Sequence, residues 1–350
     1  MILFRHRSAM RRLLFGTLVC LVVLAAAHTG LWWLATARLQ DNLTAWQAQR
    51  RAAGWTTSTG PPARAGWPLA AAIELPDPAI AGGEADLPHG LAWRAEHAEL
   101  SVALLRPLSL RIRVAGQQHL RLATLPEFGF TADRFELTVP LAPGLPSRAI
   151  DLAAVGLRAA LSTGPLDIAT LALRADTRLA SEAALAVTGS AEAIRLPPLR
   201  SGRPWPTGPR IASVSFEGGL TRAWPESGTL AARAATWRDA GGTLEVRRLV
   251  LGWGPLGLAA SATLAFDPRL QPMGDATARL VGYDTTLDAL ASSGVLPSRA
   301  VQAVEGVLAI LVRPPEDGSA PQIELPLTLH DRALAVGPFP LLRLREWVWP

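Results

Sequence analysis

The sequence has 350 residues, a formal net charge of +5 and a single cysteine. One cysteine excludes an internal disulfide, so a hydrophobic core has to hold the fold together. The chain contains no lysine, which excludes a Walker-type phosphate loop, a Schiff-base lysine and a Ser-Lys catalytic dyad.

The arginines do not indicate a nucleic-acid-binding protein, although the positive charge invites that interpretation. Four of them precede residue 13, and many others lie close to an acidic residue, as Arg94 does to Glu96 and Arg134 to Glu136. This pattern is typical of a solvated strand face rather than of a patch that follows a phosphate backbone. We therefore expect no nucleic-acid partner.

The first predicted elements are a cytoplasmic tail at residues 1–12 and a transmembrane helix at residues 13–35. The stretch Leu13–Leu34 has no fully charged side chain and would be roughly 30 Å long as a helix, about the thickness of a bilayer core. Arginines precede the stretch, and Trp32 and Trp33 lie at its far end, where indole rings favour the membrane–water interface. The pattern predicts a single-pass inner-membrane protein with a cytoplasmic N-terminus and a periplasmic domain.

A cleaved signal peptide is the alternative, with Ala25-Ala26-Ala27 as the cleavage site. The apolar run continues through Leu34, and this length favours an uncleaved anchor. Cys20 does not indicate a lipoprotein, because Val19 occupies the position where a small residue is expected.

Residues 36–53 are predicted to continue as a helix. Leu39, Leu43 and Trp46 recur at helical spacing, and Gly54 follows as a stop signal. Two interpretations are open at this point. The segment is either a helical stalk that lifts the domain off the bilayer or an ordinary first helix packed on the domain.

After Gly54 the apolar period changes to two, which predicts β-strands. Leu110, Ile112 and Val114, for example, alternate with polar residues. We expect a mainly β fold with a curved antiparallel sheet, groove-like or sandwich-like, in two β-rich halves at residues 54–196 and 210–350. The Pro/Gly-rich segment 197–209 is interpreted as a linker between them or as a long crossing loop. Strands are expected at many places, including Thr229–Ala234, and a bulge is expected near Arg247-Arg248.

Two short helices are predicted near residues 285–311, at Thr285–Ser292 and Ser298–Leu311. A sheet of about a dozen strands is too wide to be covered by two such helices. The sheet must therefore close on itself or leave an apolar trough, and we hypothesise that a lipid chain lies along such a trough. Ile112 and Leu327 are candidates for its inward-facing residues. Replacement of either by Asp is expected to abolish lipid retention.

The C-terminal Trp347 and Trp349 have two interpretations. After Arg343 and Arg345, these indoles are candidates for contact with an anionic lipid surface. At a packed terminus the same side chains would belong to the core.

No motif for catalysis or metal binding emerges. The segment Gly252–Gly257 matches GxGxxG, but a strand pattern follows it, which favours a turn between antiparallel strands over a nucleotide site. His89 and His97 lie among acidic residues at a spacing that fits no metal motif. We expect no enzyme activity, no cofactor and no metal. The alternative is a periplasmic hydrolase whose site is formed from scattered loop residues.

Several short motifs resemble the uncharacterised bacterial family called domain of unknown function 2125. They are Ala52-Ala53-Gly54-Trp55, Gly66-Trp67-Pro68, Trp93-Arg94-Ala95, Gly252-Trp253-Gly254-Pro255-Leu256 and Gly337-Pro338-Phe339-Pro340-Leu341. The resemblance implies an alpha-proteobacterial envelope protein with no assigned activity and brings no catalytic residues. More loosely, the architecture is similar to AsmA-like envelope proteins, whose long curved sheets form grooves suited to lipid chains. We expect a role in holding or guiding lipid acyl chains or in scaffolding envelope assembly, with membrane lipid and envelope proteins as partners.

Overall fold

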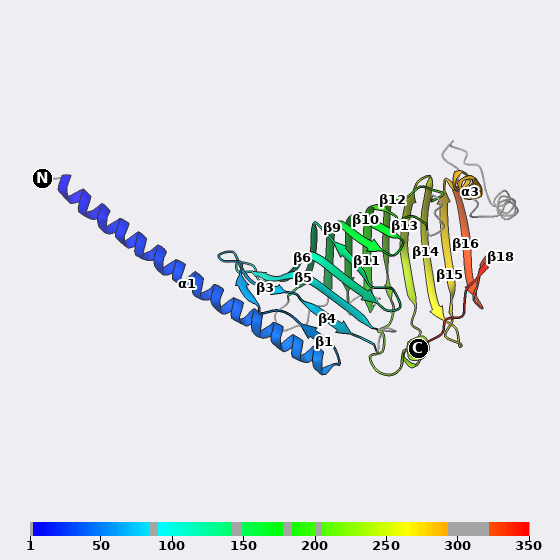
Figure 1. Ribbon diagram of the computed structural model, residues 1–350, viewed down its shortest axis with the longest axis horizontal. Helices are drawn as coiled ribbons and strands as arrows, with labels where there is room; N and C mark the ends of the chain where they lie inside the picture. The colour runs from blue at the N-terminus through cyan, green and yellow to red at the C-terminus, as the bar shows by residue number, and fades with distance from the viewer. Residues whose placement is uncertain are drawn as a thin grey trace.

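The first element is one long helix, α1 (Leu3–Ala52), which projects from one end of the molecule (Figure 1). The computed structural model describes residues 3–84, 90–141, 149–177, 184–199, 205–292 and 322–349. Arg50 and Arg51 occupy the last turn of α1, and Gly54 follows with a φ of 82°. The predicted membrane segment and the predicted helix after it are thus a single unbroken helix.

The rest of the chain is dominated by one antiparallel sheet of 18 strands, as the period-two segments predicted. The strands are β1 (Thr56–Ser58), β2 (Ala63–Ala65), β3 (Ala70–Pro76), β4 (Ala79–Gly82), β5 (Leu91–Ala103), β6 (Ser109–Leu122), β7 (Phe128–Thr131), β8 (Arg134–Pro140), β9 (Ala149–Leu161), β10 (Gly164–Asp176), β11 (Leu185–Arg195), β12 (Arg210–Leu220), β13 (Leu244–Trp253), β14 (Leu256–Phe266), β15 (Pro272–Val281), β16 (Gln322–His330), β17 (Ala333–Val336) and β18 (Phe339–Arg343).

The sheet is an open meander. From β9 to β18 each strand pairs with the next one in the chain. Near the N-terminal end, the long strand β5 pairs along its length with both β3 and β4, and β6 pairs with both β7 and β8. No pairing joins β1 or β2 to β18 among the described strands, so the sheet has two free ends.

The Pro/Gly-rich segment 197–209 joins two neighbouring strands of this sheet. β11 and β12 pair from Arg195↔Arg210 to Leu185↔Leu220. At the base of the connection, the backbone N–H of Leu196 donates to the carbonyl of Pro209 at 2.8 Å. The sheet therefore continues without a break past this segment.

One face of the sheet carries a row of apolar residues and one glycine from β3 to β16. Strand pairing places the following residues opposite one another in an unbroken row: Ile73, Leu100, Ile112, Leu137, Leu152, Leu173, Gly189, Phe216, Leu249, Ala260, Ala278 and Leu325. The other face carries ion pairs, such as Arg113–Glu99 at 3.3 Å and Arg174–Asp151 at 2.7 Å. Alternation along each strand thus separates a solvated face from an apolar face, as expected from the sequence.

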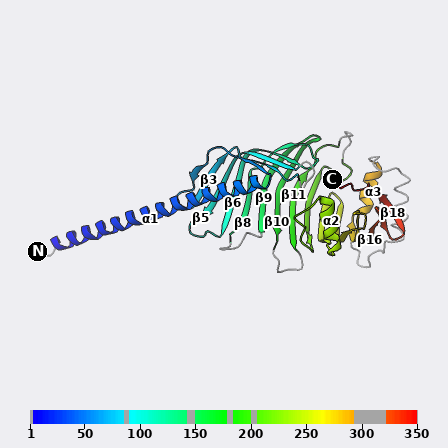
Figure 2. The same ribbon diagram turned by 90° about the horizontal axis from the view of Figure 1, so that it is seen from below.

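The second half of α1 covers one end of the apolar face. Leu39 and Leu43 pack against a buried cluster that includes Ile73 and Leu75. Figure 2 shows α1 crossing in front of the strands around β5 and β6. Of the two interpretations of this segment, the contacts therefore describe a helix packed on the sheet.

Among the described residues, little protein covers the middle of the apolar face. Ile150 in β9 is 48% exposed and Leu173 in β10 is 42% exposed, although both lie on the apolar face. These exposures leave the centre of the sheet as an open apolar surface among the described residues.

The expected strand at Thr229–Ala234 is wrong, because this segment forms the helix α2 (Leu230–Asp239). Alanine-rich sequence favours a helix, and Thr229 caps its start by accepting a hydrogen bond at Oγ1 from the N–H of Ala232. The helix ends before Gly241, which has a φ of 73°.

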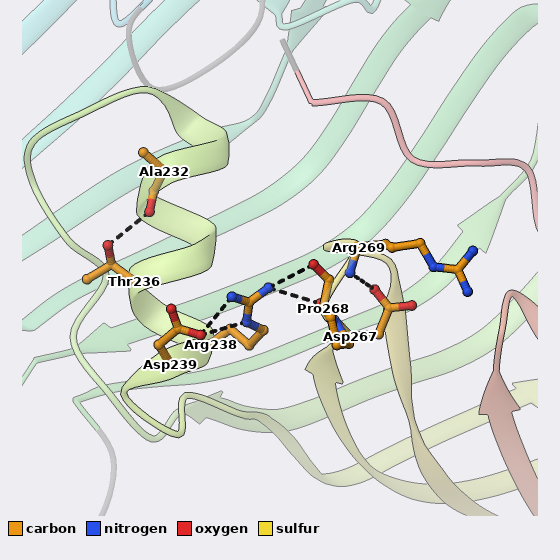
Figure 3. A network of polar contacts seen from close by, with 7 residues as sticks. All are labelled: Ala232, Thr236, Arg238, Asp239, Asp267, Pro268 and Arg269. Atoms are coloured by element: carbon orange, nitrogen blue, oxygen red, sulfur yellow. Dashed lines mark hydrogen bonds and ion pairs between the residues drawn. The ribbon is translucent and has the colours of Figure 1, made fainter.

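A polar network holds α2 on the turn between β14 and β15 (Figure 3). Arg238 donates to the carbonyls of Asp267 and Pro268 and forms an ion pair with Asp239 at 2.7 Å. The carboxylate of Asp267 accepts hydrogen bonds from the backbone N–H groups of Arg269 and Gln271, both at 2.8 Å. The network fixes α2 beside β14 and β15, away from the end of the sheet that α1 covers.

The structure also tests the predictions of a C-terminal helix pair, a bulge and a glycine turn. α3 (Tyr283–Ser292) confirms the helix predicted at Thr285–Ser292, while the segment 298–311 lies outside the described residues. The bulge near Arg247-Arg248 is confirmed by a register shift between Val246 and Leu249. Gly254 and Pro255 form the two-residue connection between the paired residues Trp253 and Leu256, so the GxGxxG match is a hairpin turn.

Candidate functional site

An apolar hollow lies between α1 and the apolar face, at the end of the sheet that α1 covers. Its volume is about 810 Å³. Strands β1, β3, β4, β5, β6 and β8 contribute to its walls, together with the connections beside them. We call this hollow the α1 groove.

The helical wall of the α1 groove comes from one stripe of α1. The residues of this stripe recur at intervals of three and four and so lie on one helix face. They are Leu31, Ala35, Arg38, Leu39, Asn42, Leu43, Trp46 and Gln47. The stripe begins inside the predicted membrane segment and continues beyond it, so the groove runs along the helix from that segment toward β1.

The sheet wall is formed by alternate residues that strand pairing brings to one face. Leu100 lies opposite Ile112, and Leu110 lies opposite both Val102 and Val139. All five line the groove. Ile112, a candidate from the sequence, is therefore placed in the groove wall.

Trp93 contributes an aromatic surface to the groove. Its Nε1 donates to Oε1 of Gln118 at 3.2 Å, and Gln118 is fully buried. The polar atom of the indole is thus satisfied inside the protein, while the ring lines the groove.

A few polar groups gather at the end of the groove near β1. Gln47 and the segment Thr57–Thr59 line this part. Oγ1 of Thr57 is buried and has no hydrogen-bond partner among the described residues. Pockets with mainly apolar walls and a few polar groups, in the range of about 300–1,000 Å³, are typical of ligand sites. Arg38 and Asn42 add polar groups along the α1 stripe. The composition of this groove suits a mainly apolar ligand that carries a polar group.

No cluster of three His, Cys, Asp or Glu side chains suited to a metal ion occurs among the described residues. His97 lies in β5, opposite Ala115 and Pro76. His89 lies outside the described residues.

The mouth of the groove lies beside the two tryptophans predicted at the membrane interface. Trp32 Nε1 donates to the carbonyl of Ala65 in β2 at 3.2 Å. The guanidinium of Arg64 lies 4.6 Å from the ring centroid of Trp33. These contacts attach the edge of the sheet to α1 at the level of Trp32 and Trp33.

The other three sequence candidates lie away from the groove. Leu327 is on the apolar face in β16, near the opposite end of the sheet, and lines a separate hollow with Glu245, Arg247 and Asp275. The structure thus places Ile112 and Leu327 on one face without bringing them together.

The C-terminal tryptophans are tied to the turn between β14 and β15. The ring of Trp349 packs on Phe266 at 5.3 Å between centroids, and its Nε1 donates to the carbonyl of Leu270. The backbone of Trp347 exchanges two hydrogen bonds with the side chain of Gln271, whereas its indole is 59% exposed. Trp349 is therefore packed against protein, and Trp347 presents its ring outward.

Sequence reasoning missed the helical half of the groove. Leu39 and Leu43 were recognised as one face of a helix, but nothing in the sequence says which surface that face meets. Their i, i+4 spacing with Leu31 and Ala35 was the available signal.

A comparison with protein families shows to which family the chain belongs. The family described as "Uncharacterized protein conserved in bacteria (DUF2125)" matches residues 32–345. The chain belongs to the DUF2125 family. No curated protein and no solved structure matches this DUF2125 chain, so the looser similarity to AsmA-like envelope proteins stays a prediction.

The DUF2125 match covers the α1 groove almost completely. It begins at Trp32 and so includes every lining residue except Leu31. The region shared with the family is therefore the groove-bearing domain together with the outer part of α1.

Proposed function

We propose that this DUF2125 protein is a single-pass inner-membrane protein whose periplasmic domain holds or guides an acyl chain of a membrane lipid. In α1, residues Phe15–Ala52 include a stretch long and apolar enough to cross a membrane, and none of that stretch is buried in the protein. Exposed apolar side chains such as Phe15, Leu21 and Leu24 need a nonaqueous environment. The arginines before residue 13 support a cytoplasmic N-terminus.

The observation that carries the proposal is the position of the α1 groove. Its apolar lining starts at Leu31, inside the stretch suited to the bilayer, and continues onto the sheet at Leu100 and Ile112. An acyl chain that passes from the bilayer along this lining would lie against apolar side chains of both α1 and the sheet. Burying ten methylenes contributes about 8 kcal/mol, which corresponds to roughly micromolar binding before the cost of association.

Lipid retention by the full chain tests this proposal. The protein is extracted into native nanodiscs, exchanged into a mild detergent and analysed by native mass spectrometry. We expect one lipid to stay bound after detergent exchange. We also expect a photoactivatable fatty acid to crosslink to residues of β5 or β6, or to the groove-lining residues of α1 between Leu31 and Gln47.

An absence of both retained lipid and crosslinking would contradict lipid handling. A protein scaffold for envelope assembly would then be the better description. Crosslinks confined to the first half of α1 would also contradict it, because they report only the lipid around the helix.

Topology gives a separate expected result. A reporter that is active only in the periplasm, fused after Pro350, will be active, because the arginine-flanked helix keeps its N-terminus in the cytoplasm. The protein will stay with the membranes after a carbonate wash. A soluble mature protein that begins near His28 would show instead that the segment is a cleaved signal peptide.

A further inference from the structure

Two loops at the mouth of the α1 groove expose large apolar side chains to an unusual degree. Trp67 is 57% exposed, Leu69 75%, Leu105 85% and Leu108 65%. We call the residues 66–69, 104–108 and Leu141 the apolar rim.

Backbone hydrogen bonds join the apolar rim into one surface. The N–H of Leu104 donates to the carbonyl of Leu69 at 3.1 Å. The N–H of Leu141 donates to the carbonyl of Leu108 at 2.8 Å. Exposed apolar residues scattered singly are ordinary, whereas a contiguous patch marks a surface that meets something apolar.

Hydrogen bonds fix the rim to α1 at a defined position along the helix axis. Nε2 of His28 donates to the carbonyl of Pro68 at 2.6 Å, and Trp32 is bonded to Ala65 as described above. His28 precedes Leu34, the last residue of the apolar stretch, by six residues, or about 9 Å along the helix. A bilayer that surrounds the stretch up to Leu34 therefore reaches the rim.

The charge of the rim suits the surface of a bilayer. Arg106 lies within the rim and Arg64 lies beside it, and the segments 60–70 and 103–110 contain no Asp or Glu. Arginine beside exposed tryptophan and leucine is the composition of interfacial segments that bind anionic lipid.

We propose that the apolar rim inserts into the leaflet that α1 leaves, so that the α1 groove opens inside the membrane. Interfacial elements bury about 5–10 Å into the boundary between headgroups and acyl chains, which matches the height of the rim along α1. Leu31, Leu104 and Leu141 line the groove and lie at this level. Lipid then enters sideways from the leaflet. The proposal rests on the membrane-spanning role of α1 but not on lipid binding in the groove.

Single-cysteine labelling of the full chain tests the insertion. The one native cysteine is removed by Cys20→Ser, and Leu105→Cys, Leu21→Cys and Ser190→Cys are made separately in that background. Each variant is labelled with the environment-sensitive fluorophore NBD. It is then placed in nanodiscs of phosphatidylcholine and phosphatidylglycerol with or without spin-labelled lipid.

We expect the label at position 105 to be quenched several-fold more than the label at position 190. Ser190 is exposed on β11, away from the rim, and is the matched control. The label at position 21, in the middle of the apolar stretch, should be quenched most.

Quenching at position 21 but not at position 105 would overturn the insertion and leave the span intact. No quenching at either position would overturn both. A blue-shifted but unquenched label at position 105 would show that protein, and not lipid, covers the rim, which also overturns the proposal.

Discussion

Replacing Ile112 with Asp will remove bound lipid from the full-length protein. Ile112 lies in the sheet wall of the α1 groove, opposite Leu100 and Leu137. A carboxylate at this position faces the apolar side chains of Leu100 and Leu137. Burying even a neutral polar group without a hydrogen-bond partner costs about 2–7 kcal/mol, and an ionised carboxylate costs more. Retained lipid, measured by native mass spectrometry, should therefore fall by more than about tenfold.

Leu327→Asp is the matched control. Leu327 is also half-buried on the apolar face, but it lies in β16 and lines a different hollow. Lipid retention in the α1 groove should be nearly unchanged in this variant. An equal loss in both variants would indicate that the chain runs along the whole face, as the sequence alone suggested.

A second groove variant distinguishes a loss of lipid binding from misfolding of the Ile112→Asp protein. Leu110→Trp adds apolar volume to the groove wall instead of charge. It should displace lipid while the protein stays folded. Retention of lipid by this variant at the native level would argue against occupancy of the groove.

Replacing Ile73 with Ala will cause a large loss of stability. Ile73 is fully buried at the centre of the cluster on which Leu39 and Leu43 of α1 pack. Truncation leaves a cavity between helix and sheet and costs about 2–5 kcal/mol. Pulse proteolysis of the full chain in nanodiscs across a urea series should show the midpoint shifting to lower urea.

Ile150→Ala gives the comparison for this stability measurement. It removes the same atoms from the same kind of strand, but Ile150 is exposed near the uncovered centre of the apolar face. The change in unfolding free energy should stay within about 0.5 kcal/mol. A comparable loss at position 150 would show that this part of the face is covered by something in the folded protein.

The strands and their two faces were predictable because alternation records burial directly. Leu110, Ile112 and Val114 alternate with arginines, and the structure places the arginines in ion pairs on the solvated face. The bulge at Arg247-Arg248 was also visible, since a slip in the apolar phase requires an extra residue in one strand.

The sequence did not predict the helix α2, because alanine fits the pattern of a strand as well as that of a helix. Residues 229–234 contain three alanines, whose small side chains also fit a strand, whereas capping by Thr229 favours the helix. The α1 groove was missed for a different reason. The wall that Leu39 and Leu43 form depends on where α1 lies on the sheet, and helical periodicity carries no information on that placement.

In the membrane-spanning arrangement proposed above, the unbroken course of α1 would make the domain respond to the thickness of its bilayer. A helix of 50 residues is a rod of about 75 Å, and the contacts at His28, Trp32, Leu39 and Leu43 fasten its outer half to the sheet. A thinner bilayer makes a long apolar helix tilt. The tilt is then transmitted to the whole sheet, so membranes of different thickness set the angle at which the sheet stands on the lipid surface.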